Sequence, residues 1–432
     1  MPAELGTELA LPCGVTLKNR LFKSAMTEGL AGPDGRANQR HVNLYRTWAA
    51  GGAAMLLSGN VMIDRRYLER PGNIVIDGNG GDAELRALSQ AVAEQDCHLW
   101  MQISHPGRQC SRIVTAHPMA PSPVQLNMLA YFGKPRAMTS EDIHKAIAGY
   151  ARVAAVARDT GFSGVQVHAA HGYLLSQFLS PVVNRREDEW GGSLENRARL
   201  LLETVRAVRT AVGTDYPLAV KLNSADFQKG GFSLEESMVV AGWLSELGID
   251  LLEISGGTYE QARLLGHTGK AANIDEPLRE STRRREAYFV DYAKQIRSAV
   301  SCPLAVTGGF RSRSGMQEAL ANGELDAIGL ARPLCTQPDI PRLLISGEAE
   351  ECDRHEDNLR LGNGIFGPNS NNAMFKALNT QGAVAWFYRQ ILRLADNQPV
   401  LPELTMLRAL LAHFRDETRI GLARRAWLKK HG

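Results

Sequence analysis

Two histidines and a tyrosine follow a short apolar segment near the middle of the chain. The stretch GVQVHAAHGY contains His168, His171 and Tyr173 directly after two alternating valines. Two imidazoles can donate hydrogen bonds to one oxygen atom, and a phenol with a reference pKa of about 10 keeps its proton at neutral pH. These side chains suit a site that polarises a carbonyl group and supplies a proton. The same residues also allow simple core packing, or a metal site completed by His105 or a carboxylate.

The backbone must turn for the two histidines to meet. Val165 and Val167 indicate a buried strand over 164–168, and residues three apart on a strand point to opposite faces. His168 and His171 therefore converge only if the chain turns after His168.

Composition and charge argue against several classes of protein. The 432 residues contain 49 Lys and Arg against 46 Asp and Glu, so no global field attracts nucleic acid or a membrane surface. The N-terminus shows no basic stretch followed by an apolar core, and no segment has the apolar length of a membrane span. The six cysteines are dispersed without a CxxC pair, which argues against disulfides, structural zinc and iron–sulfur clusters. We expect a cytoplasmic protein with no metal and with no nucleic-acid or membrane partner; its oligomeric state is left open, a homo-oligomer included.

Eight apolar runs alternate with segments of helical spacing. This α/β alternation predicts a parallel sheet covered by helices, and eight strands with polar or glycine residues at their C-terminal ends fit a (β/α)8 TIM barrel. A doubly wound sheet fits less well, because no GxGxxG turn follows the first strand. The predicted strands are 20–26, 53–60, 98–104, 164–168, 217–223, 250–255, 303–308 and 326–331. The predicted helices are 38–50, 82–95, 140–160, 193–212, 233–247, 284–300 and 312–322.

Longer segments complete the predicted organisation. The connections 108–139 and 256–283 have the length of lids or substrate walls. After residue 347 the pattern changes, so we divide the chain into a barrel of residues 1–347 and a helical C-terminal extension of residues 348–432. The basic end of the extension could contact an anionic partner, although a solvated helix face accounts for it as well.

Glycines and an arginine after the last two strands predict a phosphate site. Gly308 and Gly309 follow the seventh strand, and Gly329 and Arg332 lie at the end of the eighth. Backbone amides of glycine turns and a guanidinium group both bind phosphate oxygens, and barrels of this kind often hold phosphate at this position.

Polar residues on other strands predict a second polar site at the same rim. Lys221 lies in an otherwise apolar strand, and a buried lysine requires an anionic or carbonyl partner. A reduced flavin would supply that negative charge. Gln102 and Thr27 offer hydrogen-bonding groups to the same ligand. The structural alternatives are a Lys221 paired with a nearby Asp or Glu, a Gln102 bonded to the backbone, and a Thr27 that serves only in a turn.

Together these segments resemble the Old Yellow Enzyme family of FMN-dependent ene-reductases, also called NADH:flavin oxidoreductases. The resemblance covers about residues 5–347. It rests on LKNRLFKSAMTEG, on MQISHPGRQ with its QxxHxGR motif, and above all on HAAHGYLLSQFLSPVVNRREDEWGGSLENR, with weaker matches at KLNSADF, VTGGFR and IGLARP. It implies FMN at the barrel mouth, NADH or NADPH as the reductant, and a small α,β-unsaturated molecule as the substrate.

The resemblance also implies a role for each site residue. His168 and His171 would bind the carbonyl oxygen of the substrate, while hydride passes from flavin N5 to Cβ. Tyr173 would donate a proton to Cα on the opposite face. The residues that would bind FMN are Ala25, Met26, Thr27, Gly59, Gln102, Lys221, Gly308, Gly309, Gly329 and Arg332.

Departures from the family pattern limit which cofactors and cofactor contacts we expect. Lys221 stands where many members have arginine, which keeps the charge but removes the forked geometry. Only Cys335 and Cys352 lie after the barrel strands and no dinucleotide motif follows, so we expect neither a 4Fe–4S cluster nor a second flavin. The alternative functions are an FMN barrel that modifies nucleic acid, as the tRNA dihydrouridine synthases do, or another flavin-dependent dehydrogenase. The near-neutral charge disfavours the first of these.

Overall fold

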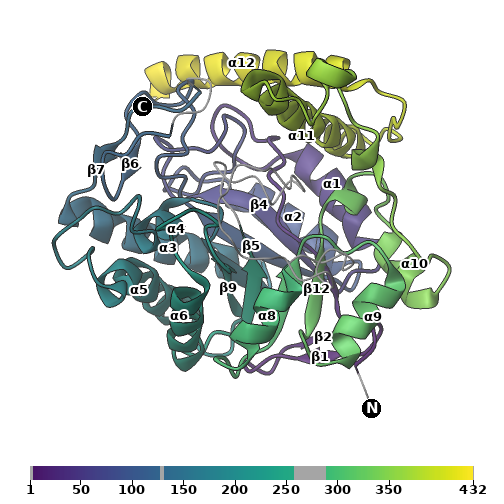
Figure 1. The fold of residues 1–432 in the computed structure, drawn as a ribbon, viewed down its shortest axis with the longest axis horizontal. Helices are drawn as coiled ribbons and strands as arrows, with labels where there is room; N and C mark the ends of the chain where they lie inside the picture. The colour runs from purple at the N-terminus through teal and green to yellow at the C-terminus, as the bar shows by residue number, and fades with distance from the viewer. Residues whose placement is uncertain (1–2, 127–130, 257–288, 432) are drawn as a thin grey trace.

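The protein folds as a closed barrel of eight parallel strands surrounded by helices (Figure 1). The structure, a computed structural model, describes residues 3–126, 131–256 and 289–431. The strands in barrel order are β3 (Leu21–Lys23), β4 (Met55–Met62), β5 (His98–Ser104), β8 (Gly164–Ala169), β9 (Leu218–Asn223), β10 (Leu251–Ser255), β11 (Leu304–Thr307) and β12 (Ala327–Leu330). The barrel closes where β12 pairs with β3. The predicted (β/α)8 fold is therefore confirmed.

Each strand alternates between the helix-facing surface and the inside of the barrel. On β9, Leu218, Val220 and Leu222 belong to the main core between strands and helices. Ala219 belongs to a separate apolar cluster inside the barrel. Lys221 lies two residues after Ala219 and therefore also points inward. The interior thus changes from apolar at the N-terminal ends of the strands to polar at their C-terminal ends.

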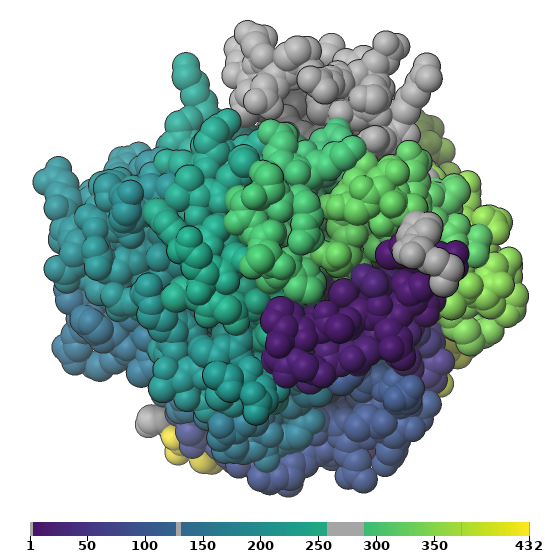
Figure 2. Space-filling view, turned by 90° about the horizontal axis from the view of Figure 1, so that it is seen from below, coloured from purple at the N-terminus to yellow at the C-terminus, as the bar shows by residue number. Residues whose placement is uncertain are grey.

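A two-stranded antiparallel hairpin covers the apolar end of the barrel. It consists of β1 (Leu9–Ala10) and β2 (Thr16–Leu17). Leu11 and Leu17 pack against inward residues of the barrel strands, including Trp100. Figure 2 shows this N-terminal segment across the face seen from below. Apolar side chains therefore fill the base of the barrel.

Helices cover the outside of the barrel, and several begin at a side-chain cap. Asn38, Thr139 and Ser233 each accept a backbone N–H at a helix start and form a capping box. The helices are α1 (Gln39–Ala49), α2 (Asp82–Ala93), α3 (Ser140–Asp159), α4 (Leu174–Leu179), α5 (Leu194–Val212), α6 (Leu234–Glu246), α8 (Val290–Arg297), α9 (Arg313–Ala321) and α10 (Ile340–Ser346), with a 3-10 helix η2 (Arg332–Cys335). Among the helices of the described ranges, none combines the length and the hydropathy that a membrane span requires.

Some predicted boundaries differ from the structure. The first strand, predicted over 20–26, pairs only over Leu21–Lys23, because the following residues form the rim. The second strand extends past its predicted end at residue 60, because pairing with β5 resumes after an irregularity between Leu57 and Asn60. The predicted helix 284–300 is observed as α8, and its first residues lie outside the described ranges. The predicted connection 256–283 lies almost wholly outside them too.

The C-terminal extension contains two long helices that pack against each other and against the barrel. They are α11 (Ala373–Ala395) and α12 (Met406–His431), preceded by the 3-10 helices η3 (His355–Asp357) and η4 (Gly364–Phe366). Trp386, Ala409 and Leu410 belong to the same core as the barrel helices. In Figure 1, α12 lies on the opposite side of the molecule from β1 and β2. Arg424 of α12 contacts the loops that follow β3 and β4, so α12 lies at the C-terminal ends of the strands.

Candidate active site

The chain turns after His168, as the histidine spacing requires. β8 ends at Ala169, and His171 has a φ of 61°, a left-handed conformation that few non-glycine residues adopt. The ring centroids of His168 and His171 are 5.1 Å apart, and those of His168 and Tyr173 are 4.9 Å apart. Tyr173 immediately precedes α4 and is buried. The three rings therefore meet in one cluster, which we call the ring triad.

Burial keeps both imidazoles uncharged at neutral pH. It lowers the pKa of His168 well below the usual value, and neighbouring His171 and Lys221 lower it further. Burial, followed by Lys221, has the same effect on the pKa of His171. His168 Nδ1 accepts a hydrogen bond from the Ala170 backbone N–H at 3.2 Å, which leaves the proton of the neutral ring on Nε2. His171 Nε2 lies 2.8 Å from Ser255 Oγ.

Lys221 pairs with a buried glutamate inside the barrel. Lys221 Nζ lies 3.0 Å from Glu253 Oε1, and both side chains are at most 3% exposed. The two residues are cross-strand partners on β9 and β10. Glu253 also accepts hydrogen bonds from Gln166 Nε2 at 2.7 Å and from Thr307 Oγ1 at 2.5 Å. The ammonium group thus has the anionic partner that its burial requires.

Gln102 joins the same set of hydrogen bonds. Its Nε2 donates to Gln166 Oε1 at 2.6 Å, and its backbone N–H donates to Ser58 Oγ at 2.9 Å. On the other side of the barrel, Ser24 Oγ lies 2.6 Å from Thr307 Oγ1. These contacts connect a continuous interior polar layer: Ser24, Gln102, Gln166, Lys221, Glu253 and Thr307.

Thr27 and Gly59 are held by two carboxylates. Thr27 Oγ1 donates to Glu69 Oε2 at 2.8 Å, and Asn60 Nδ2 donates to the same oxygen at 2.7 Å. The Gly59 N–H donates to Glu28 Oε1 at 2.8 Å. A Cβ on Gly59 would lie 2.3 Å from Glu28 Oε2, so this close approach favours glycine.

Ala25 and Met26 lie on the rim between β3 and Thr27 and are half-buried. Ala25 packs against the apolar cluster inside the barrel, and Met26 packs against the main core, with its Sδ 3.7 Å from Cys335 Sγ. Packing therefore positions both residues, and their contact with a cofactor stays a prediction.

The phosphate end consists of the turn after β11 and Arg332. Gly308 and Gly309 have φ angles of 116° and 90°, so glycine is strongly favoured in this turn. Arg311 forms an ion pair with Glu356, and Arg332 Nη1 lies 3.4 Å from Glu356 Oε1. Burial raises the pKa of Glu356, but the two guanidinium groups outweigh it and the pKa is lowered. Two cations therefore share one carboxylate, which belongs to η3 of the extension.

Gly329 lies inside the barrel wall. It is the cross-strand partner of Thr307, and a Cβ at Gly329 would lie 2.0 Å from Thr307 Oγ1 and 2.3 Å from Ser24 Oγ. Glycine thus leaves room for the contact between the two hydroxyl groups. Phosphate binding by Gly329 stays a prediction.

Several polar side chains of this region were not predicted, among them Gln166, Glu253, Arg311 and Glu356. The first two carry a recognisable signal, because each is a polar residue at an inward position of an apolar strand. Glu356 carries none, because it lies outside the barrel strands in an irregular polar segment.

The metal alternative has no ligand cluster in the part of the chain that the structure describes, where no group of three His, Cys, Asp or Glu residues is suited to hold an ion. His105 instead accepts the Gly107 N–H on Nδ1 at 3.0 Å, and its ring contacts Tyr67 with centroids 5.2 Å apart.

Known proteins match most of this chain. The family described as NADH:flavin oxidoreductase / NADH oxidase matches residues 12–351. The chain is 37% identical over 363 residues to the NADH-dependent flavin oxidoreductase iliE of Neonectria sp. (strain DH2), covering 79% of this chain and 47% of that protein. It is 34% identical over 377 residues to the protein of the same name from Hypocrea jecorina (strain QM6a), covering 81% and 92%.

A solved structure is also similar. The old yellow enzyme homologue from Zymomonas mobilis is 27% identical, with a TM-score of 0.69 over 82% of this chain and 95% of that one. The chain thus spans about half the length of the Neonectria relative and nearly all of the other two. The family match ends before α11 and α12.

Proposed function

Because the chain belongs to the NADH:flavin oxidoreductase / NADH oxidase family, that is, the Old Yellow Enzyme family of flavoenzymes with FMN and NADH or NADPH, we propose that it reduces carbon–carbon double bonds conjugated to a carbonyl or nitro group. The observation that carries this proposal is the ring triad, in which two neutral imidazoles and a phenol meet at the end of β8.

The residues at the rim fit FMN. Asn60 Oδ1 is buried and has no hydrogen-bond partner among the described residues, so an acceptor is available beside Gly59. Gln102 and Lys221 would hold the polar edge of the ring, with Thr27 next to them, and the phosphate end offers a glycine turn and guanidinium groups. Bound FMN would supply the hydride-transfer chemistry that links oxidation of NADH or NADPH to reduction of the alkene at Cβ.

His168 and His171 would bind the oxygen of the activating group. Neutral imidazoles donate N–H groups without carrying charge of their own, and donors aimed at an oxygen are worth most where negative charge develops. The N–H of His168 is fixed on Nε2 by the hydrogen bond from Ala170 to Nδ1. Lys221, the cross-strand partner of His168, is paired with Glu253, so the two imidazole N–H groups would provide most of the stabilisation.

Tyr173 would complete the reaction as a general acid. Hydride addition at Cβ leaves electron density at Cα, which requires a proton. The Tyr173 ring lies against His168, so the phenol is close to any substrate whose oxygen the histidines hold.

The test is a pair of half-reactions on the purified protein. We expect yellow protein whose bound FMN is bleached by NADH or NADPH under anaerobic conditions. A cyclic enone, a maleimide or a nitroalkene should then restore the flavin absorbance and yield the saturated product. Protein that contains FMN but is reoxidised by none of these compounds would contradict the ene-reductase function, whereas protein without FMN would contradict cofactor binding itself.

A further inference from the structure

The inner face of α12 contacts the loops at the catalytic rim of the barrel. Arg424 donates from Nη1 to the Pro33 carbonyl at 3.2 Å and from Nη2 to the Arg65 carbonyl at 2.9 Å. These carbonyls belong to the loops that follow β3 and β4, at the C-terminal strand ends where a barrel places its active site. The extension thus lies directly on the walls of the candidate site.

The same helix also donates hydrogen bonds to the long connection after β5. Arg425 donates from Nε to the Ile113 carbonyl at 2.8 Å and from Nη2 to the Arg112 carbonyl at 3.0 Å. A Cβ on Gly421 would lie 2.5 Å from Ile113 Cδ1, so the helix and this loop are in close contact. The loop was expected to form a substrate wall, and α12 holds it from outside.

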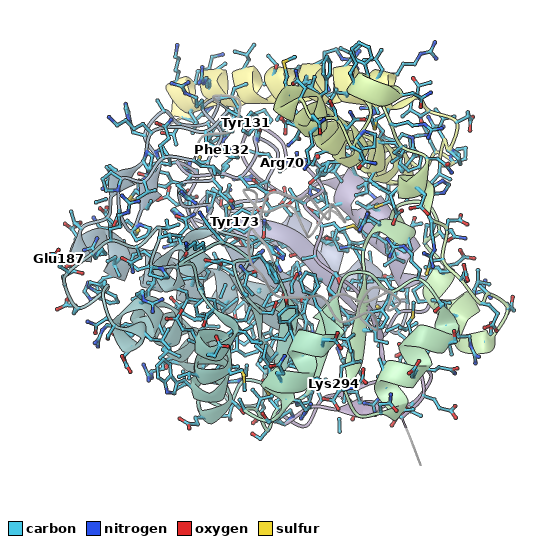
Figure 3. All side chains as sticks on the ribbon, viewed as in Figure 1. Arg70, Tyr131, Phe132, Tyr173, Glu187 and Lys294 are labelled. Atoms are coloured by element: carbon cyan, nitrogen blue, oxygen red, sulfur yellow. The ribbon has the colours of Figure 1, made fainter. Side chains whose placement is uncertain are left out.

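Glu417 is the point at which α12 joins two of these loops. Its Oε2 accepts the Tyr131 hydroxyl at 3.2 Å, and its Oε1 lies 3.1 Å from Arg70 Nη2. The side chains of Arg70 and Glu417 are only 14% and 15% exposed, so water screens the pair weakly. The guanidinium group of Arg70 also lies over the Tyr388 ring of α11, 4.0 Å from its centroid. Figure 3 shows Arg70 and Tyr131 between α12 and Tyr173 in this view.

The loop that Glu417 holds is connected to the ring triad. The Arg112 N–H donates to the Tyr131 carbonyl at 2.9 Å, and Ser111 forms an antiparallel bridge with Phe132. Two residues before Ser111, Gln109 Nε2 donates to the carbonyl of His171 at 3.0 Å. A continuous path of contacts therefore runs from Glu417 through the paired backbone of this loop to the strained residue of the triad.

We propose that the C-terminal extension forms the outer wall of the substrate site and that Glu417 is a positioning residue for substrate binding. It fixes the loop after β5 through Tyr131 and the loop after β4 through Arg70, and neither contact belongs to the FMN-binding residues. This inference rests on the proposed function for the identity of the substrate. We expect its effect on the binding of molecules that enter this site, and not on the chemical steps once the site is saturated.

The experiment compares Glu417→Gln and Glu417→Ala with Asp416→Asn in the FMN-loaded enzyme. Asp416 is the adjacent acid on α12, similarly buried, but it pairs with Arg389 of α11 at 2.7 Å and so acts within the extension. Binding of 4-hydroxybenzaldehyde is followed by the flavin absorbance, alongside KM and kcat for a cyclic enone, the rate of flavin reduction and the melting temperature. The phenol measurement needs no alkene reduction, so it separates a failure of this inference from a failure of the proposed function.

We expect Glu417→Ala to raise the dissociation constant of the phenol and the KM of the enone by on the order of tenfold, below the roughly hundredfold that a displacement of about 1 Å can cause. Glu417→Gln should give a smaller increase, because it can still accept the Tyr131 hydroxyl. At saturating NADH or NADPH, the rate of flavin reduction should be unchanged in all three variants, and Asp416→Asn should bind the phenol within about twofold of the parent enzyme. Equal phenol affinities for Glu417→Ala and Asp416→Asn would overturn the proposal.

Discussion

The candidate site has two ends that are built in different ways: the ring end, by which we mean the interior polar layer together with the ring triad, and the phosphate end. At the ring end, the interior polar layer satisfies its own hydrogen bonds among residues of the barrel strands, and Lys221 and Glu253 are almost completely buried. At the phosphate end, the charges of Arg311 and Arg332 are met by Glu356 from the extension. One end is internally balanced, and the other takes its counter-charge from a separate part of the chain.

This difference indicates which end of the site tolerates substitution and which does not. A buried, fully bonded layer is costly to change, because removing one partner leaves the other charge unpaired in a dry environment. A part-exposed carboxylate that bridges two arginines can be replaced with less damage. We therefore expect substitutions at the ring end to impair function or stability, and a substitution at Glu356 to alter cofactor affinity without loss of the fold.

The largest effect is expected for Tyr173→Phe at the ring end. Loss of a general acid typically slows the catalysed step by about a hundredfold to ten-thousandfold. Reoxidation of the reduced flavin by an enone should fall by at least about a hundredfold, and flavin reduction by NADH or NADPH should remain within a few-fold of the parent rate. Stopped-flow measurement of the two half-reactions checks this. If both half-reactions slow equally, Tyr173 is not the proton donor.

Glu253→Gln should destabilise the protein by about 3 kcal/mol, since it leaves a buried lysine unpaired. The free energy of unfolding is measured by chemical denaturation of the cofactor-free protein, and the FMN content of the purified variant should also fall. Asp250→Asn is the control. Asp250 is a buried acid that directly precedes β10, and it pairs with Arg209 at 2.7 Å, away from the interior polar layer. A loss of FMN in both variants would show that the effect is general destabilisation.

The double variant His168→Asn and His171→Asn should weaken binding of a phenolate by at least about a hundredfold, since two hydrogen bonds to a charged oxygen contribute about 1.5–3 kcal/mol each. Titration of the flavin absorbance with 4-hydroxybenzaldehyde measures this. FMN content should be preserved, because neither imidazole belongs to the phosphate end or the interior polar layer. Unchanged phenol affinity would assign the histidines to packing alone.

Glu356→Gln should tighten FMN binding roughly threefold to tenfold, because like charges placed next to each other disfavour association. The carboxylate lies beside both arginines of the phosphate end, where it repels a phosphate dianion and occupies its donors. Quenching of flavin fluorescence on binding to the cofactor-free protein gives the dissociation constant. A weaker affinity would mean that Glu356 pre-orients the arginines, and the two ends of the site would then be alike.

The smallest expected change is in the pH dependence of ligand affinity, to which the ring triad should contribute nothing near neutral pH. The pKa values of His168 and His171 are lowered well below 6.5, so neither ring gains a proton as the pH falls from 8 to 6. Between these limits, the affinity for a neutral ligand such as an enone should stay constant. An inflection near pH 6.5 that disappears in the double histidine variant would show that a triad histidine titrates in the ordinary range.

The same contrast explains what could be predicted from the sequence. Alternation along the strands identifies Lys221 as an inward residue, and Glu253 in DLLEIS obeys the same rule, so the ring end follows from local pattern. The turn that brings His171 to His168 is required by their spacing and is observed. Glu356 and Glu417 follow no such rule, because their partners lie far away in the chain and only the packing of the extension brings them to the rim.

The hairpin of β1 and β2 closes the barrel at the N-terminal ends of its strands. Leu9, Leu11 and Leu17 fill this end of the barrel with apolar side chains, so the described residues leave no path for a substrate through the base. Under the proposed function, the electron donor and the electron acceptor would therefore both approach from the other end of the barrel, at the C-terminal ends of the strands. We therefore expect an excess of either compound to inhibit binding of the other, so that binding as well as chemistry would limit the rate of turnover.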